Sequence, residues 1–189
     1  MTVSLLSDAH RVAISLPILR EWRLSRLAGD NDGVARRPTL VEPGIWVGGI
    51  PSRRCWRELR EAGVTAAVCL LQEGPPPRWM TSLEQLLWLP VLDNHAPNHE
   101  QLAAGCCFLD AAREHGRTAL VFCGAGMGRA PTLYLAWRAR RVGETLNAAI
   151  ERLRSARSVL RLTTRQVGAL QSWFADPRGT ARSLPLGSP

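Results

Sequence analysis

A short glycine-rich segment holds the residues whose types and spacing are best suited to chemistry. In it Cys123 precedes Arg129 by six positions, and Gly124, Gly126 and Gly128 lie between them. Glycines let a backbone turn sharply and point successive N–H groups inward, which forms a concave site for an anion. A helix expected directly after the loop adds its N-terminal N–H groups and positive dipole end, which favour a bound phosphate and a cysteine thiolate. The segment therefore predicts a phosphate site with a cysteine nucleophile.

Arg129 is suited to grip two phosphate oxygens, because a guanidinium is a planar fork of donors. Spacing alone is a weak indicator, since Cys107 and Arg113 have the same separation. The residues between that second pair contain no glycine and repeat with helical periodicity, so we interpret the pair as structural. The predicted phosphate-binding residues are Gly124, Ala125, Gly126, Met127, Gly128 and Arg129.

The elements expected around this loop alternate between strands and helices. A capping serine, Ser52, and a stop at Gly63 bound one expected helix, and Val167, Leu170 and Phe174 are expected to be buried on the last one. Apolar runs predict strands at 45–47, 64–71, 88–92 and 118–122, a helical turn at 83–87, and helices at 100–115, 131–141, 146–153 and from 163 or 164 onward. The pattern predicts the α/β class: a single domain with a central mixed sheet flanked by helices, and the glycine loop between a strand and a helix.

Length and composition favour one catalytic domain. A chain of 189 residues that is 46% hydrophobic can bury one sizeable core. We expect a loosely ordered extension at 1–40, the catalytic domain at 41–175 and a flexible tail at 176–189. No stretch approaches the roughly 18 apolar residues of a membrane span, and the N-terminus lacks the pattern of a secretory signal. We therefore expect a cytoplasmic protein with no membrane partner.

Charge and cysteine content indicate which classes of partner and cofactor to expect. The formal net charge is +8 and all 24 basic residues are arginine, which favours an anionic partner. The arginines are scattered and not interleaved with aromatic residues, so a nucleic-acid partner is not expected. The cysteines number five and lack metal-ligand spacing, which favours reduced thiols and predicts neither a metal site nor a cofactor.

Together, these motifs resemble the protein tyrosine phosphatase superfamily in its dual-specificity branch. The glycine-rich segment from Cys123 to Arg129 resembles the signature loop of that superfamily and is called the signature loop below. The resemblance extends from about Ile45 to Phe174 and includes the strand that ends at Glu73 and the pair Arg157 and Gln166. The resemblance implies a phosphomonoester hydrolase that works through a phospho-cysteine at Cys123. It also implies a phosphorylated protein as substrate, with phosphotyrosine and, more broadly, phosphoserine or phosphothreonine.

Attack by the thiolate leaves an alkoxide or phenolate that needs a proton, so a carboxylic acid beside the pocket is required. Asp93 is the predicted general acid. It lies 30 residues before Cys123 and directly after an expected strand, and the resemblance places the general acid in the equivalent loop. Glu100, the nearby alternative, is interpreted as part of a helix start.

Three positions depart from the family pattern or add to it. Phe122 replaces the usual histidine before the nucleophile, and Ala130 replaces the serine or threonine whose hydroxyl helps the sulfur leave. The resulting Arg-Ala-Pro sequence also resembles the phosphatases of regenerating liver and plant glucan phosphatases. The alternatives are therefore a catalytically weak phosphate-binding pseudophosphatase or a phosphoglucan phosphatase, with a rhodanese-like enzyme ranked last. We interpret Cys69 as a buried structural cysteine. The alternative, a redox partner that forms a disulfide with Cys123, is ranked second.

Overall fold

The computed structural model describes residues 36–176 of the chain, and these form one five-stranded sheet with helices on both faces. The sheet order is β1-β2-β5-β3-β4, with β1 antiparallel to β2 and all other neighbours parallel. The strands are β1 (Thr39–Glu42), β2 (Ile45–Gly48), β3 (Val64–Leu71), β4 (Gln85–Val91) and β5 (Thr118–Phe122). The predicted mixed sheet is confirmed.

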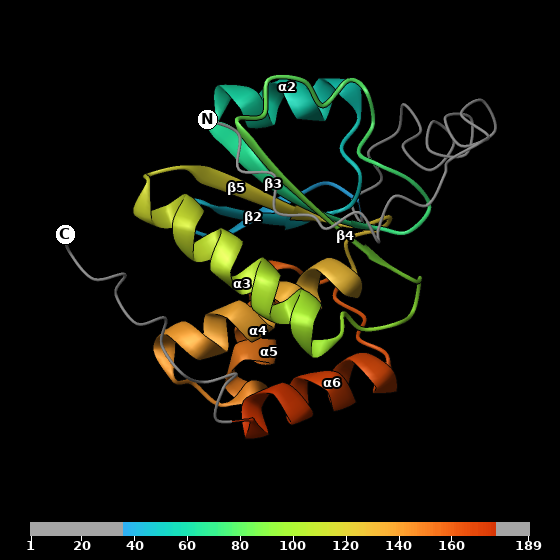
Figure 1. Cartoon of the computed structure of the whole chain (residues 1–189), viewed down its shortest axis with the longest axis vertical. Helices are drawn as coiled ribbons and strands as arrows, with labels where there is room; N and C mark the ends of the chain where they lie inside the picture. The colour runs from blue at the N-terminus through green and yellow to red at the C-terminus, as the bar shows by residue number, and fades with distance from the viewer. Residues whose placement is uncertain (1–35, 177–189) are drawn as a thin grey trace.

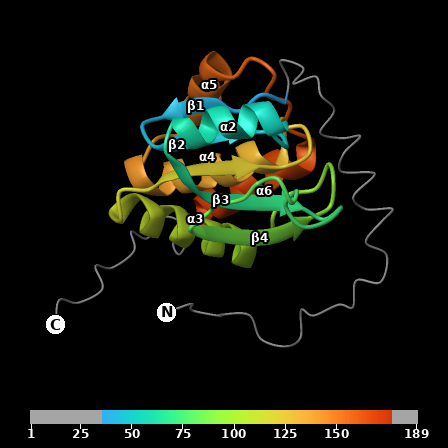
Figure 2. The same ribbon diagram turned by 90° about the horizontal axis from the view of Figure 1, so that it is seen from above.

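The helices lie in two unequal layers. Figure 1 shows one helix above the sheet and the remaining helices below it, and the view from above agrees (Figure 2). The upper helix is α2 (Arg53–Glu61), and the lower layer holds α3 (His99–Glu114), α4 (Arg129–Val142), α5 (Leu146–Ala156) and α6 (Thr164–Ala175). This arrangement confirms the predicted α/β domain with helices flanking the sheet.

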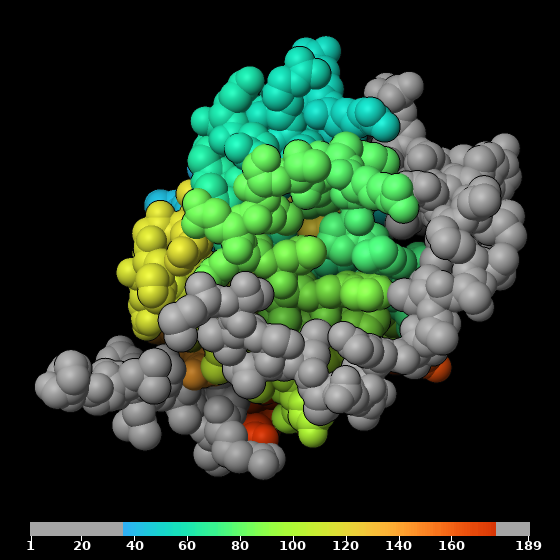
Figure 3. Space-filling view, turned by 45° about the horizontal axis from the view of Figure 1, so that its top comes forward, coloured from blue at the N-terminus to red at the C-terminus, as the bar shows by residue number. Residues whose placement is uncertain are grey.

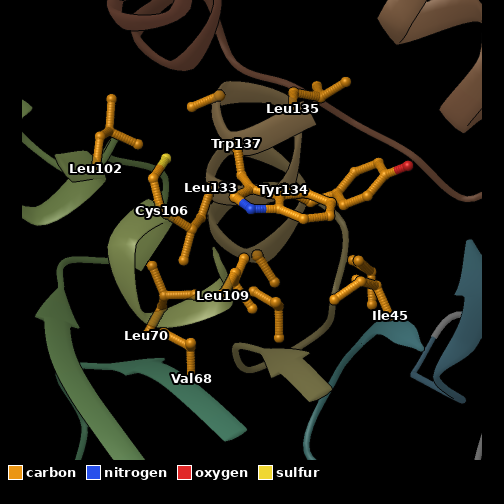
Figure 4. Close-up of a cluster of buried hydrophobic side chains, with 14 of the residues drawn as sticks. Ile45, Val68, Leu70, Leu102, Cys106, Leu109, Leu133, Tyr134, Leu135 and Trp137 are labelled. Carbon is orange, nitrogen blue, oxygen red and sulfur yellow. The ribbon is translucent and has the colours of Figure 1, made fainter. Parts of the chain in front are cut away.

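Each layer has its own hydrophobic core. The larger one lies between the sheet and the lower helices, where Trp137 and Tyr134 of α4 are fully buried with Leu109 of α3 and Leu70 of β3 (Figure 4). The smaller one lies under α2 and includes Trp56, Leu59 and Phe122. Burial of such side chains contributes roughly 1.5 to 3 kcal/mol each, so the two cores fix the sheet from both sides.

The segment between β3 and β4 packs beside α2, as the cyan and green surfaces show in the space-filling view (Figure 3). Trp79 Nε1 donates a hydrogen bond to the carbonyl oxygen of Pro51 at 3.1 Å. Arg60 Nη1 donates to the carbonyl oxygen of Thr81 at 3.1 Å, so both ends of α2 hold this segment.

Local sequence signals account for most helix ends. The Ser52 side chain accepts a hydrogen bond from the N–H of Cys55 at 3.1 Å, which confirms the predicted cap of α2. Gly63 and Gly116 have φ values of 85° and 67°, a region that favours glycine after a helix. The predicted stop at Gly63 is therefore confirmed, and Gly116 follows the end of α3 in the same way.

Two predictions within the fold are wrong. The segment 83–87 is not a helical turn, because β4 begins at Gln85 and pairs in parallel with β3. Leu83, Leu86 and Leu87 have helical spacing, but pairing with an already buried neighbouring strand decides the conformation. On α6 the buried residues are Gln166, Leu170 and Trp173, so the helix is rotated from the predicted face and Val167 and Phe174 are only partly buried.

Some predictions fall outside the described part of the chain. These predictions concern most of the expected extension, residues 1–35, and most of the expected tail, residues 177–189. The domain bounds therefore stay a prediction. The described segment adds β1, which begins at Thr39 and pairs with β2. Among the helices of residues 36–176, none has the length and apolar character required to cross a membrane.

Candidate active site

The glycine loop lies at the carboxyl end of β5, between that strand and α4. Strands β2 and β3 flank β5 in parallel, and the carboxyl ends of parallel strands are where open α/β sheets bind ligands. The N–H of Cys123 donates to the carbonyl oxygen of Gly48 at 3.2 Å. Cys123 is 3% exposed, and its Sγ accepts a hydrogen bond from the N–H of Gly126 at 3.3 Å. The sulfur therefore faces a donor of its own loop.

Gly126 is a position where only glycine fits. Its φ is 72°, and a Cβ there would lie 2.2 Å from the carbonyl carbon of Gly48 and 2.3 Å from the nitrogen of Gly49. Both neighbours are backbone atoms and cannot move aside cheaply. The signature loop thus packs directly against the turn that follows β2, and this contact fixes the curvature of the signature loop.

Arg157, at the end of α5, holds the signature loop in place through hydrogen bonds. It is 2% exposed, and burial lowers the pKa of its guanidinium. Its Nε donates to the carbonyl oxygen of Gly126 at 2.8 Å, while Nη1 donates to the carbonyl oxygen of Arg37 at 2.8 Å and to Thr39 Oγ1 at 3.0 Å. Arg157 therefore joins the loop to the segment that enters β1.

Arg129 is buried at the start of α4 and is held in a bidentate ion pair. It is 3% exposed; its Nη1 and Nη2 donate to the two carboxylate oxygens of Glu73 at 3.0 Å and 3.1 Å. Nη1 also donates to the carbonyl oxygen of Val91 at 2.9 Å. These contacts fix the plane of the guanidinium, which is the feature that bidentate phosphate recognition requires.

The two partners of this ion pair shift each other's titration. Burial alone would raise the pKa of Glu73, but the hydrogen bonds and charge of Arg129 outweigh it, so that pKa lies below its ordinary value. Burial opposes the charge of Arg129 as well, but Glu73, Cys123 and Asp93 together raise its pKa. The pair is therefore charged on both sides across the neutral pH range.

Asp93 forms a second ion pair with the same guanidinium. Asp93 Oδ1 lies 3.1 Å from Arg129 Nη2, and the aspartate side chain is 68% exposed. It follows β4 after a single residue. The structure thus brings Asp93 and Cys123 to one arginine, although they are 30 residues apart in the chain.

The loop that carries Asp93 is attached to the start of α6. Asn94 has a φ of 60°, and its carbonyl oxygen accepts a hydrogen bond from Thr163 Oγ1 at 3.2 Å. Gln166 Nε2 donates to the carbonyl oxygen of His95 at 2.9 Å. The carboxylate is therefore exposed, but its backbone is held in place by α6.

His95 adds a side-chain contact to this attachment. Its Nδ1 lies 3.0 Å from the carbonyl oxygen of Asp93, and its Nε2 lies 2.6 Å from Arg165 Nη1. An arginine can only donate, so Nε2 is the acceptor and Nδ1 carries the proton. This tautomer lets the ring join α6 to the backbone of Asp93.

These groups line one pocket of about 220 Å³. It is lined by the signature loop, by the loop at 92–98 that carries Asp93, here called the acid loop, and by the start of α6. The lining residues among those described are Asp93, Asn94, Cys123, Ala125, Met127, Gly128, Arg129, Arg161, Leu162, Thr163 and Gln166. In the same described range, no group of three or more His, Cys, Asp or Glu side chains is placed to hold a metal ion.

The residues predicted from sequence meet at this pocket, although not all of them line it. Cys123, Arg129 and Asp93 do. Gly124 and Gly126 are not among the lining residues, but both leave room for close contacts of the loop: a Cβ on Gly124 would lie 3.1 Å from Arg129 Nη2.

Three supporting side chains were not assigned a role from sequence: Glu73, Arg157 and Gln166. Each acts through a tertiary contact, so spacing alone does not reveal it. The available signal was the family resemblance, which included all three positions without giving their contacts.

The departures from the family pattern are all buried. Phe122 and Ala130 are fully buried, so Phe122 belongs to the core under α2 and supplies no polar group to the pocket. Cys69 is fully buried opposite Phe122 in the β3–β5 register, and burial raises the pKa of its thiol. All five cysteines are free, and the prediction that Cys69 is buried is confirmed.

A strand, a glycine loop and a helix that bring a cysteine and an arginine into one pocket define a class of cysteine-based, phosphate-binding α/β domains. Comparison with known families gives the particular one. Residues 45–176 match the family described as dual specificity phosphatase, catalytic domain. The chain belongs to this family, and the predicted cysteine-dependent phosphatase of the dual-specificity class is confirmed.

Individual relatives agree with this assignment. Mouse dual specificity phosphatase 28 is 30% identical over 120 residues, which cover 63% of this chain and 72% of that protein. Human dual specificity protein phosphatase 12 is 31% identical over 117 residues, which cover 60% of this chain but 34% of that protein.

Solved structures show the same fold. The crystal structure of human DUSP28 is 27% identical, with a TM-score of 0.63, and the match covers 72% of this chain and 91% of that one. The crystal structure of Tk-PTP in the active form has a TM-score of 0.67 at 24% identity, over 73% of this chain and 96% of that one. The second likeness concerns the fold alone.

Proposed function

We propose that this chain hydrolyses phosphomonoesters on proteins through a phospho-cysteine at Cys123. Arg129 and the N–H groups of the signature loop bind the phosphate, and Asp93 is the general acid. The observation that carries the proposal is the convergence of these three side chains, from the loop after β5, the start of α4 and the loop after β4, on one pocket. We assign the activity to residues 41–175, with 1–40 and 176–189 as flanking segments.

The first step transfers the phosphoryl group to sulfur. The Cys123 thiolate attacks phosphorus, an S–P bond forms, and the P–O bond to the leaving group breaks with its electron pair going to oxygen. Asp93, protonated in the substrate complex, gives its proton to that oxygen. A phosphate on Arg129 competes with the Asp93 carboxylate for Nη2, so substrate binding directs Asp93 toward the leaving group.

The second step hydrolyses the phospho-cysteine and regenerates the free enzyme. Asp93, now a carboxylate, takes a proton from a water molecule that attacks phosphorus, and the S–P bond breaks to release phosphate and the thiolate. The thiolate accepts one hydrogen bond, from the N–H of Gly126. Ala130 offers no hydroxyl to the departing sulfur, so this step limits turnover.

The lining of the pocket favours a phosphorylated protein over a phosphoglucan. Sugar rings are commonly held by stacking on aromatic side chains, and no aromatic ring is among the described lining residues. Trp56, Trp137 and Trp173 are buried in the cores. The free cysteines support a reducing compartment, so the cytoplasm is the proposed location.

A second function is favoured by one observation. Ala130 and Phe122 remove two groups that assist turnover, while the bidentate pair of Arg129 with Glu73 keeps the phosphate site intact. A pocket of this kind can recognise a phosphorylated partner without hydrolysing it. The retained pairing of Asp93 with Arg129 supports the enzyme over this reader.

Hydrolysis of para-nitrophenyl phosphate under reducing conditions tests the proposal. We expect turnover by the wild type, none by Cys123→Ser, and roughly a 10²-fold or greater loss of kcat in Asp93→Asn. Cys107→Ser is the matched control, since Cys107 is an exposed cysteine on α3 with an arginine six positions later. Its activity should equal that of the wild type.

A rapid-mixing measurement separates the two functions. A burst of para-nitrophenolate followed by slow turnover identifies breakdown of the phospho-cysteine as the slow step. Wild-type protein that binds vanadate but shows neither a burst nor turnover is a reader, and the proposed hydrolysis is then wrong.

A further inference from the structure

Arg161 lies in the loop between α5 and α6 and belongs to the same pocket as Cys123. Its backbone N–H donates to the carbonyl oxygen of Met127 at 2.9 Å, so the signature loop itself fixes its position. Arg161 is the second cation of the described pocket lining, after Arg129.

The charge of Arg161 is not neutralised within the described part of the chain. Its Nη1 donates to the carbonyl oxygens of Leu160 at 2.8 Å and Ser158 at 3.4 Å. Both acceptors are uncharged, and in residues 36–176 no carboxylate pairs with this guanidinium. Arg129, by contrast, has Glu73 and Asp93. A cation that is anchored at a pocket without a carboxylate is available to a ligand.

The two arginines lie at different depths. Arg129 is 3% exposed, whereas Arg161 is exposed. The buried one therefore serves the phosphate at the bottom of the pocket and the exposed one serves a group at the rim. One additional cation suits one additional anion, because the loop residues Ala125, Met127 and Gly128 are neutral.

We infer that Arg161 is a specificity-determining residue, which binds an acidic side chain next to the phosphorylated residue of a protein substrate. The inference rests on the proposed function, since it names the substrate class of the same pocket. A polyphosphorylated lipid headgroup would present several anions, which a single rim arginine cannot match.

Paired phosphotyrosine peptides test this inference. One carries glutamate beside the phosphotyrosine and the other carries alanine. We expect kcat/KM of the wild type to favour the glutamate peptide roughly fivefold at low salt, as a partly exposed ion pair contributes, and to lose this preference as salt is raised. Arg161→Gln should reduce the ratio to about one, and Arg161→Lys should restore part of it.

Arg154→Gln is the control for net charge. Arg154 lies on α5, pairs with Glu151 and does not line the pocket, so its ratio should equal that of the wild type. Equal kcat/KM for the two peptides in the wild type, or an unchanged ratio in Arg161→Gln, overturns the inference while leaving the hydrolase intact.

Binding to Cys123→Ser keeps the two proposals distinguishable. If the wild type hydrolyses nothing, the same peptides are compared by dissociation constant in Cys123→Ser with and without Arg161→Gln. A preference that depends on Arg161 supports the inference even though the proposed hydrolysis fails, and no preference overturns both. An Arg161 dependence seen only with a short-chain phosphatidylinositol phosphate overturns the assignment to protein substrates.

Discussion

At the scale of single residues, Arg129 is the centre of the site because it joins two carboxylates with different tasks. Glu73 holds the guanidinium through both carboxylate oxygens from a partly buried position. Asp93 Oδ1 lies 3.1 Å from Nη2 of the same guanidinium, and its side chain is 68% exposed. The first contact is therefore suited to fixing the arginine, and the second to exchange with substrate phosphate.

Replacing Glu73 with glutamine tests the holding role through stability and pH. At neutral pH we expect Glu73→Gln to lower the free energy of unfolding by about 1 to 3 kcal/mol, since buried Arg129 loses its charged partner. The pKa of Glu73 is depressed in the folded protein, so its contribution is present above the ordinary value of 4.5 and is lost as pH falls through the folded value. Urea unfolding at neutral pH and at about pH 3 should thus show a smaller acid loss for the variant. An equal loss in both proteins contradicts this role.

In the proposed mechanism, Ala130 affects the second chemical step. It is fully buried beside Arg129, and a serine there adds a single oxygen close to the signature loop. We expect Ala130→Ser to raise kcat roughly tenfold by assisting departure of the sulfur, and to abolish the burst of para-nitrophenolate. Ala130→Gly changes the size without adding a hydroxyl and serves as the control. A faster Ala130→Gly variant assigns the effect to packing and not to the hydroxyl.

At the scale of elements, the start of α6 has two tasks. Thr163 caps the helix by accepting from the N–H of Gln166 at 3.3 Å, and its hydroxyl also donates to Asn94 in the acid loop at 3.2 Å. Gln166 completes the capping box and donates to His95 at 2.9 Å. The same side chains that cap the start of α6 therefore also hold the backbone of the loop that carries Asp93, the proposed general acid.

Two matched cap variants separate these tasks. Thr163→Ala and Thr145→Ala each remove an N-cap, on α6 and α5 respectively, and each should cost about 1 kcal/mol of stability. Only Thr163→Ala also releases Asn94, so only it should lower kcat, by roughly tenfold, because small displacements of a catalytic group are costly. Unfolding curves and para-nitrophenyl phosphate kinetics on both variants check this. Equal kcat losses in the two variants show that helix stability, and not loop position, is responsible.

The strands and helices that could be predicted from the sequence are those whose determinants are local. Strands β3 and β5 were predicted with their observed bounds, because each is an apolar run that follows a glycine stop. Strand β1 was missed because its four residues gain their conformation from pairing with β2, and the turn predicted at 83–87 was wrong for the same kind of reason. Leucines spaced as in a helix do not reveal whether the segment pairs with a neighbouring strand.

The residues of the site show the same division between local and tertiary determinants. The loop from Cys123 to Arg129 is continuous in sequence, so a phosphate site could be predicted from it directly, and Asp93 was predicted from its position after a strand together with the family resemblance. The contacts of Arg157 with the loop and of Gln166 with the acid loop join segments far apart in the chain. Only the folded structure reveals such partners, since no periodicity connects them.

At the scale of the whole molecule, an ion-pair cluster ties the first strand to the C-terminal helices. Arg138 of α4 lies 2.7 Å from Glu42 of β1 and 2.5 Å from Glu144, which precedes α5. Tyr134, one helical turn before Arg138, is 1% exposed. Because β2 continues from β1 into the turn against the signature loop, this cluster supports the site from the far side of the fold.

Tyr134 reports on this cluster directly, since it is the single tyrosine of the chain. Burial, followed by the charge of Glu42, raises its pKa from 10 to about 12. A group whose folded pKa is raised contributes stability that is complete below its unfolded value and is lost as pH rises through the folded one. We therefore expect about 2 to 3 kcal/mol of stability to be lost between pH 10 and pH 12, and Tyr134→Phe to be free of this loss. Tyrosinate absorbance should titrate near pH 12 in the folded protein and near pH 10 in denaturant; titration at one pH in both states shows that the cluster does not shield the phenol.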